Sequence, residues 1–158
     1  MTRAFVLTVS DRGHAGQMAD QSGPAVAGLL TGGGFEVGAV QIVPDEREQI
    51  AGALTAAAEA GYDLVVTTGG TGLGPRDVTP QATAAVLDFE VPGLSEAMRH
   101  AGLASTPLAA LSRGVAGVRR GTLIVNLPGS VRGATESLEA VLPALPHAVK
   151  LLQGDTGH

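Results

Sequence analysis

The chain of 158 residues, of which 44% are apolar and 16% charged, has the size and composition of a single globular domain. Its net charge of −5, with three Phe, one Tyr and no Trp, excludes the basic surface and stacking aromatic side chains that nucleic-acid-binding proteins use. The absence of cysteine excludes disulfides, thiolate nucleophiles and cysteine-based zinc sites.

The same features predict where the protein is found. The apolar run at the N-terminus stops at Asp11, so it is shorter than a secretory signal, and no segment has the length of a membrane span. A chain without cysteine fits a reducing compartment. We therefore expect a cytoplasmic protein that binds neither nucleic acid nor membranes.

Strands and helices alternate along the predicted structure. Apolar, β-branched runs predict five strands, at residues 4–10, 35–43, 63–68, 114–118 and 122–126. Apolar residues at helical spacing predict six helices, at about residues 23–30, 46–60, 80–90, 92–103, 131–142 and 144–153. Residues 119–121 favour a hairpin between the last two strands. This order predicts one α/β domain over residues 1–158, with helices on both faces of the sheet.

Four unusual sequences follow predicted strands. They are Ser10 with Asp11, Asp45 in PDE, the glycine loop that starts at Thr68, and Asn126 in NLPG. Parallel strands joined by right-handed crossovers place their carboxyl ends along one edge of a sheet. We therefore expect these four sequences to meet at one edge and to form a pocket there.

The glycine loop reads TTGGTGLGPRDVTP and covers residues 67–80. Glycines permit positive φ and let a ligand approach the main chain, while Thr79 is suited to an N-cap and Pro80 to a first helical residue. The loop lacks the lysine of a P-loop, because Lys150 is the single lysine of the chain. A plain tight turn is the alternative, but the sequence favours a loop that binds phosphate or another ligand.

Two aspartates near these loops have competing interpretations. Asp77 precedes a helix, where it is either a favourable negative charge or a Mg²⁺ ligand that lets a phosphate bind beside it. For Asp45, the spacing to Glu48 favours a capping box that opens the helix at residue 46. Its expected position on the same sheet edge as Asp77 keeps a paired-carboxylate site as the alternative.

Two further motifs carry weaker signals. In NLPGS, Pro128 and Gly129 suit the centre of a type II turn and Ser130 suits an N-cap. The sequence ALSRG (residues 110–114) is weakly similar to a nucleophile elbow, but no preceding strand or suitably spaced histidine supports a hydrolase triad. The four histidines do not have the spacing of metal ligands.

Taken together, the motifs resemble the molybdopterin-binding proteins of molybdenum-cofactor biosynthesis, namely the molybdopterin adenylyltransferases and the related domain of gephyrin. The resemblance covers almost the whole chain, in the order TVSDRGHAGQMADQSGP, IVPDE, TTGGTGLGPRDVTP, PLAALSRGVAGV, LIVNLPGS and LPALPHAVKLL. It implies a three-layer α/β/α sandwich with a mixed, mostly parallel sheet, assembled as a homotrimer.

The resemblance also implies an activity. A terminal phosphate oxygen of molybdopterin attacks the α-phosphate of ATP, giving adenylylated molybdopterin and pyrophosphate, and the product passes to a separate molybdate-insertion activity. Asp45 and Asp77 match the essential carboxylates of the family and are expected to act through Mg²⁺. The alternative is a non-catalytic, carrier-like member that binds molybdopterin or a nucleotide.

The resemblance finally implies which residues bind molybdopterin and ATP. They are Ser10, Asp11, Thr68, Gly69, Gly70, Thr71, Gly72, Ser112, Asn126, Pro128, Gly129 and Ser130. One departure follows NLPGS, where some relatives carry lysine and this chain has Arg132. Arginine keeps the charge but changes its geometry, so the role of this residue is open.

Overall fold

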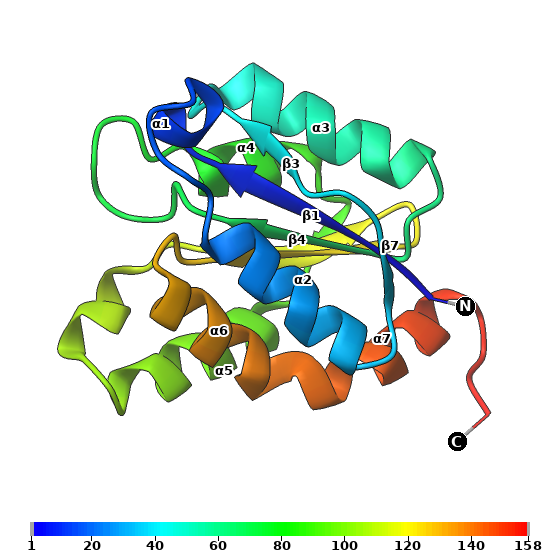
Figure 1. Cartoon of the computed structure of the whole chain (residues 1–158). Coiled ribbons are helices and arrows are strands. Elements are labelled where there is room, and N and C mark those ends of the chain that lie inside the picture. The colour runs from blue at the N-terminus through cyan, green and yellow to red at the C-terminus, as the bar shows by residue number, and fades with distance from the viewer. Residues whose placement is uncertain (1, 158) are drawn as a thin grey trace.

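The computed structural model describes residues 2–157, which form a seven-stranded sheet with helices on both faces (Figure 1). The strands are β1 (Arg3–Val9), β2 (Glu36–Val37), β3 (Gln41–Val43), β4 (Leu64–Thr68), β5 (Phe89–Glu90), β6 (Ala116–Arg119) and β7 (Thr122–Leu127). The helices are α1 (Asp11–His14), α2 (Ser22–Gly32), α3 (Arg47–Glu59), α4 (Thr79–Val86), α5 (Pro92–Leu103), α6 (Val131–Val141) and α7 (Leu145–Leu152), with 3₁₀ turns η1 (Pro107–Leu111) and η2 (Leu142–Ala144). The predicted α/β class is confirmed.

The sheet is mostly parallel. Its order is β2-β1-β4-β7-β6-β5, and β3 pairs with β1 on the same side as β2. Pairings among β1, β2, β3, β4 and β7 are parallel, whereas β6 is antiparallel to both β7 and β5. The carboxyl ends of β1, β3, β4 and β7 therefore lie at one edge of the sheet.

The predicted hairpin between β6 and β7 is confirmed. Arg119 pairs with Thr122 across a two-residue turn, in which Arg120 and Gly121 have φ values of 46° and 83°. Positive φ at both central positions is the geometry of a type I′ turn, whose twist matches that of the flanking strands. The glycine supplies the second of these φ values without a steric cost.

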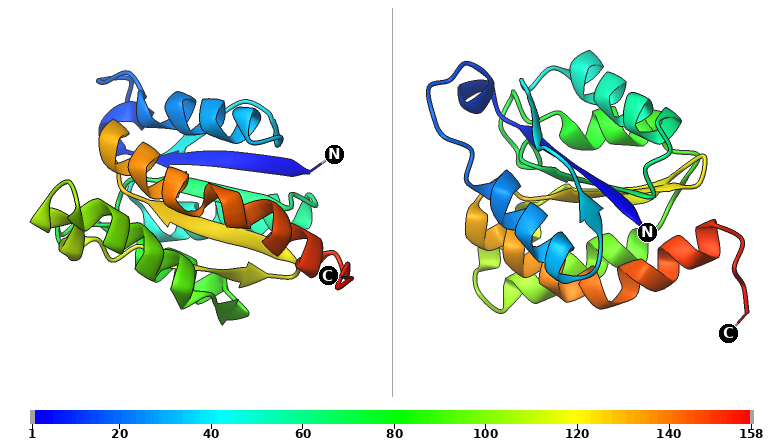
Figure 2. Two further views of the ribbon diagram at one scale, coloured as in Figure 1. Left: turned by 90° about the horizontal axis from the view of Figure 1, so that it is seen from below. Right: turned by 45° about the vertical axis from the view of Figure 1, so that its right-hand side comes forward.

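The sheet separates two apolar cores. Along β4, Leu64 and Val66 face one core and Val65 faces the other, because side chains alternate across a strand. Helices α2, α5, α6 and α7 lie side by side on the face of the larger core, and α3 and α4 cover the opposite face (Figure 2). This arrangement is the three-layer α/β/α sandwich that the resemblance implies. Among residues 2–157, no helix has the length and apolar character required to cross a membrane.

Two predicted elements differ from the structure. The stretch 35–43 forms two short strands, because the chain leaves the sheet after Val37 and residues 38–40 lie outside it, with Val40 packed against the larger core. The helix predicted for residues 80–90 ends at Val86. Beyond it, the backbone N–H groups of Asp88 and Val91 donate to β6, so residues 89–90 form the edge strand β5.

Candidate active site

The carboxyl ends of the strands meet as the sequence predicts. After β1, the backbone N–H of Ser10 donates to the carbonyl of Val43 at the end of β3, at 2.9 Å. After β4, the N–H of Gly69 donates to the carbonyl of Leu127 at the end of β7, at 3.1 Å. The ends of β1 and β3 are therefore joined to each other, and so are the ends of β4 and β7, at the one edge of the sheet where these four strands end.

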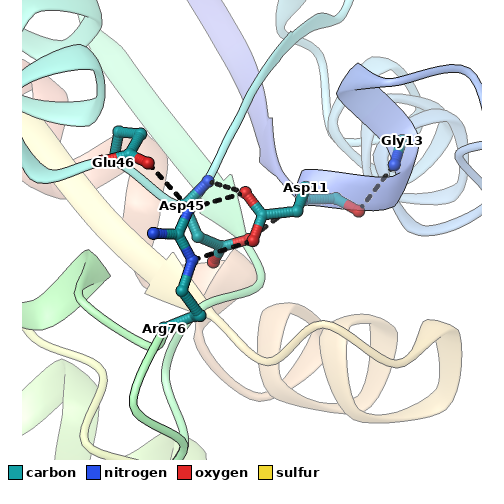
Figure 3. Close-up of polar contacts among 6 residues, drawn as sticks. Asp11, Gly13, Asp45, Glu46 and Arg76 are labelled. Carbon is teal, nitrogen blue, oxygen red and sulfur yellow. Dashed lines mark hydrogen bonds and ion pairs between the residues drawn. The ribbon is translucent and has the colours of Figure 1, made fainter.

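Asp11 and Asp45 exchange hydrogen bonds across this edge (Figure 3). The N–H of Asp11 donates to Asp45 Oδ2 at 3.0 Å, and the N–H of Asp45 donates to Asp11 Oδ1 at 2.9 Å. The guanidinium of Arg76 donates to both carboxylate oxygens of Asp11, at 3.1 Å each, and to Glu46 Oε1 at 2.8 Å. One arginine from the glycine loop thus ties together the loops after β1 and β3.

These contacts correct the capping-box interpretation of Asp45. The N-cap of α3 is Glu46, which makes no side-chain cap hydrogen bond within the described chain. The carboxylate of Asp45 instead accepts from the backbone of Asp11, which lies 34 positions away in the sequence. The spacing to Glu48 favours a local cap, but the partner that the structure supplies follows the neighbouring parallel strand β1.

The two linked aspartates have opposite pKa shifts. Arg76 lowers the pKa of Asp11 by hydrogen bonding, and the bond with the Asp45 backbone adds to this. Burial raises the pKa of Asp45, and the nearby carboxylates of Asp11 and Asp77 act in the same direction. Within residues 2–157, Asp45 forms no ion pair. It is therefore a partly buried carboxyl group among other carboxylates, an arrangement that a bound cation would stabilise.

Asp77 lies inside the glycine loop. Its Oδ2 accepts from the N–H of Gly74 at 2.9 Å. A Cβ atom added to either Gly72 or Gly74 would lie 2.9 Å from this oxygen. The carboxylate therefore fits because these two residues are glycines, which explains the sequence pattern better than a plain turn does.

The position of Thr79 corrects another prediction. Thr79 is the first residue of α4, and the N-cap is Val78. The Thr79 hydroxyl is buried and has no hydrogen-bond partner among residues 2–157. The hydroxyl adjoins Gly70, where an added Cβ would overlap it and would lie 3.1 Å from Asp45 Oδ1. An unpaired hydroxyl and a carboxylate oxygen thus both approach the glycine loop at Gly70.

A cavity of about 540 Å³ opens beside the loop. This volume is within the range of small-molecule sites. Of the predicted residues, those that line it are Gly70, Thr71, Gly72, Asp77, Ser112, Asn126, Pro128, Gly129 and Ser130. The opposite wall consists of residues from α5, η1 and α6, among them Met98, Leu108 and Leu111. Sequence reasoning did not identify this wall, because η1 has no periodic pattern.

The other predicted residues lie outside the cavity lining but close to it. Ser10 caps α1 by accepting from the N–H of Gly13, and Asp11 pairs with Arg76. The hydroxyl of Thr68 is buried and lies 3.0 Å from the hydroxyl of Ser22. Gly69 has a φ of 94° and packs against the Val9 carbonyl, while Asp45 adjoins the cavity through Gly70.

The NLPGS segment is partly as predicted. Ser130 is the N-cap of α6 and accepts from the N–H of Gly133 at 3.0 Å, which confirms the cap. The type II turn is wrong, because Gly129 does not have the positive φ that such a turn requires. Its lack of a side chain serves a close approach instead, since a Cβ there would lie 3.2 Å from the Cα of Gly69.

Asn126 holds the strands beneath the cavity. Its side-chain nitrogen donates to the hydroxyls of Thr67 and Thr83 at 3.0 and 3.1 Å, and its oxygen accepts from the N–H of Val115 at 3.1 Å. Only 2% of this residue is exposed. Asn126 therefore fixes the segment that enters β6 in place relative to β7 and α4.

Arg113 is a functional candidate that sequence reasoning missed. Its guanidinium donates to the carbonyls of Gly72 and Asp77, at 2.8 Å each, and to Gln81 Oε1 at 3.3 Å. The backbone N–H of Arg113 also donates to the Thr71 carbonyl, at 2.8 Å. In the sequence, Arg113 lies in ALSRG, which is weakly similar to a nucleophile elbow, and in PLAALSRGVAGV, one of the segments of the family resemblance. Neither pattern assigns this side chain a role at the glycine loop.

Arg132 lines the cavity at the start of α6. Its Nε donates to Glu136 Oε1 at 2.8 Å, one helical turn further along the same face. Because the Arg132 side chain is 78% exposed, this ion pair leaves a solvent-exposed cation at the cavity mouth.

A comparison with known proteins agrees with this geometry. Residues 5–147 match the family model described as a probable molybdopterin binding domain. The chain belongs to this family. A MoaB from Thermus thermophilus, described as a molybdopterin biosynthesis enzyme, has 58% identity and a TM-score of 0.92, and the match covers 98% of each chain.

Relatives with curated names share the whole domain. The molybdopterin adenylyltransferase of Helicobacter pylori (strain J99) is 43% identical over 155 residues, which cover 95% of this chain and 87% of that protein. Gephyrin of Dictyostelium discoideum is 43% identical over 157 residues, which cover 93% of this chain. The chain spans 22% of that gephyrin and 47% of the molybdenum cofactor biosynthesis bifunctional protein of Synechococcus elongatus. The family resemblance noted in the sequence is thereby confirmed.

Proposed function

We propose that the chain is a molybdopterin adenylyltransferase of molybdenum cofactor biosynthesis, which transfers AMP from ATP to molybdopterin and releases pyrophosphate. The observation that carries the proposal is the convergence of Asp45 and Asp77, from two different strand ends, on one glycine loop at the cavity. The pKa of Asp45 is raised in part by Asp77, so the two carboxylates are close enough to repel each other. The adenylyltransferase name of the Helicobacter pylori relative supports the same activity.

The residues at the loop fit a bound Mg²⁺. Among residues 2–157, no group of three or more His, Asp and Glu side chains is placed to hold a metal by itself. Mg²⁺ is usually bound through one or two carboxylates together with substrate phosphates, so Asp45 and Asp77 suffice as its protein ligands. The unpaired hydroxyl of Thr79 beside Gly70 is a further oxygen at the same place. When bound, Mg²⁺ would neutralise charge on the phosphates and on the two carboxylates.

The protein's own contribution to this reaction is positioning. Phosphoryl and nucleotidyl transfer depend on alignment and charge stabilisation more than on a protein nucleophile. The glycine loop leaves its main chain open to a ligand at Gly70 and Gly72. The start of α6, with Ser130 as its cap, faces the same cavity and favours an anionic group.

Three further parts of the proposal concern the protein in its cell. We place it in the cytoplasm, as a homotrimer that delivers adenylylated molybdopterin to a molybdate-insertion enzyme. A monomer of 15.8 kDa gives a clear mass difference from a trimer. Light scattering with size-exclusion chromatography would decide the assembly, and a monomer at micromolar concentration would contradict it.

The activity is tested by incubating the protein with molybdopterin, ATP and Mg²⁺. We expect adenylylated molybdopterin and pyrophosphate in equal amounts, with loss of both on addition of a chelator. Asp77→Asn, which keeps the shape of the side chain, should abolish turnover and leave the circular dichroism spectrum unchanged. Saturable binding of molybdopterin without pyrophosphate release would instead show the carrier-like alternative.

A further inference from the structure

We propose that Arg113 is a positioning residue, which holds Asp77 and the glycine loop in the geometry that the transfer reaction requires. This inference rests on the proposed function. Arg113 lies between η1 and β6, outside the sequences that first suggested the site. Its side chain spans the loop, because it donates to the carbonyl of Gly72 at one end and to the carbonyl of Asp77 at the other, both at 2.8 Å.

The loop between these two carbonyls is closed on itself. The N–H of Gly74 donates to Asp77 Oδ2 at 2.9 Å, and the N–H of Asp77 donates to the Gly74 carbonyl at 3.0 Å. These bonds fix the carboxylate relative to residues 74–77. Arg113 adds the contacts that fix this small ring relative to the sheet, through Gly72, Asp77 and Gln81.

Arg113 is itself held on both sides. Arg99, on α5, donates to the carbonyls of Ser112 and Gly114, at 3.3 and 3.1 Å. Two residues further along, Val115 donates its N–H to Asn126 of β7. The segment that carries Arg113 is therefore anchored to the opposite wall of the cavity and to a central strand. The contacts from Arg113 to the glycine loop, which we call the Arg113 clamp, consequently hold the loop in a fixed position relative to the sheet.

The chemistry of the contact requires arginine. The planar guanidinium presents several N–H groups in a fixed fork, and here three of its nitrogens each meet a different oxygen. A lysine ammonium is a single point of charge and cannot span the carbonyls of Gly72 and Asp77 in the same way. Arg113→Lys therefore keeps the charge and removes the fork.

A matched control is available in Arg119. This side chain is also half-buried, and its Nη1 donates to the backbone carbonyl of Val86 at 2.9 Å. It lies at the far edge of the sheet, because β6 runs antiparallel to β7 and ends there. Arg119→Lys thus tests the loss of an arginine–carbonyl bond away from the cavity.

The first experiment compares kcat and KM for ATP in the two lysine variants. We expect Arg113→Lys to lower kcat about a hundredfold, because small displacements of a reacting group cost that much, while KM changes less than about threefold. Arg119→Lys should retain kcat within about twofold. For Arg113→Ala, added methylguanidine should restore part of kcat. A kcat for Arg113→Lys equal to that of Arg119→Lys would overturn the inference.

The second experiment does not depend on turnover. Amide hydrogen exchange over residues 70–78 should be faster in Arg113→Lys than in wild type, and unchanged in Arg119→Lys. If wild type released no pyrophosphate, the proposed function would fail, whereas the exchange result would still decide whether the clamp holds the loop. Unchanged exchange in Arg113→Lys would overturn the inference, as would faster exchange with an unchanged kcat.

Discussion

The glycine loop is held by an arginine on each flank, and the two arginines work differently. Arg76 reaches outward to carboxylates, the paired oxygens of Asp11 and one oxygen of Glu46, and its side chain is 56% exposed. Arg113 is half-buried and reaches inward to backbone carbonyls of the loop itself. The Arg76 contacts join exposed charged groups, whereas the Arg113 contacts pair partly buried main-chain carbonyls.

This difference separates the roles of the two flanks. Exposed ion pairs contribute little stability and weaken with salt, so the Arg76 flank can rearrange when an anionic ligand enters. A hydrogen bond to a shielded carbonyl is costly to lose, since its acceptor is then left unpaired. We infer that the loop is fixed from the Arg113 side, near Asp77, and adjustable on the Arg76 side, near Asp45.

The largest effect is expected for a change that disturbs both flanks at once. Gly70 has a φ of 69°, and a Cβ there would overlap the Thr79 hydroxyl and lie 3.1 Å from Asp45 Oδ1. Gly70→Ala should lower the free energy of unfolding by about 1–3 kcal/mol, the cost of a strained backbone position. Turnover should fall below detection, because the added Cβ pushes the loop, and Asp77 with it, away from Asp45 and Thr79. Chemical denaturation and the pyrophosphate assay measure the two effects.

The control for this substitution lies in a helix. Gly52 is an exposed residue of α3, and a Cβ there would meet nothing within 4 Å. Gly52→Ala should raise the free energy of unfolding by about 0.5–1 kcal/mol, because alanine favours the helix. If both alanine variants behaved alike, the close packing around Gly70 would not matter.

The parts of the fold that the sequence predicts are those set by local patterns. Apolar runs locate the central strands, and residues 119–121 favour the hairpin that joins β6 to β7. The meeting of Asp11, Asp45 and the glycine loop at one edge also follows, because parallel strands impose it. These features depend on strand order and not on individual side-chain partners.

The parts that the sequence did not predict depend on partners distant in the chain. The local sequence around Asp45 predicts a helix cap. Its carboxylate instead accepts a hydrogen bond from Asp11, because β1 and β3 pair as adjacent parallel strands. The Arg113 clamp has the same cause, because its targets lie 36 and 41 positions earlier. Such a distant partner can be identified only when the order and register of the strands are known.

The next prediction sets the two arginines against each other directly. Arg113→Ala should lower the free energy of unfolding by about 1–3 kcal/mol, since it leaves the carbonyls of Gly72 and Asp77 unpaired. Arg76→Ala should have a smaller effect, and one that shrinks further in high salt, because its partners are exposed carboxylates. Denaturant titration at low and high salt measures both. A larger loss for Arg76→Ala would reverse the assignment of the two flanks.

The pH dependence of stability should differ in sign between the two linked aspartates. Asp45 has a raised pKa, so its stabilising contribution is present below its ordinary value of 3.8 and is lost as pH rises through the raised pKa. Asp45→Asn should therefore have a higher Tm than wild type near neutral pH, with the difference shrinking as the solution is acidified. The asparagine oxygen still accepts from the Asp11 N–H, so this bond is retained.

Asp11 provides the opposite case. Its pKa is lowered, so its contribution is present above its ordinary value of 3.8 and is lost as pH falls through the lowered pKa. Asp11→Asn should have a lower Tm than wild type near neutral pH, with the gap closing in acid. Thermal melts of both variants from neutral to acidic pH test this, and shifts of the same sign would contradict the opposed pKa directions.

The smallest effect is expected at Arg132, a third arginine at the same cavity. Like Arg76 it is exposed and paired with a carboxylate, but its partner Glu136 lies on its own helix and not on another loop. Arg132→Lys keeps a cation at the cavity mouth, so Tm and kcat should remain at the wild-type level and KM for ATP should change less than about threefold. Steady-state kinetics provides the measurement. A large fall in kcat would mean that an exposed arginine can affect the reaction without holding the glycine loop. The contrast between Arg76 and Arg113 would then not explain which arginine controls kcat.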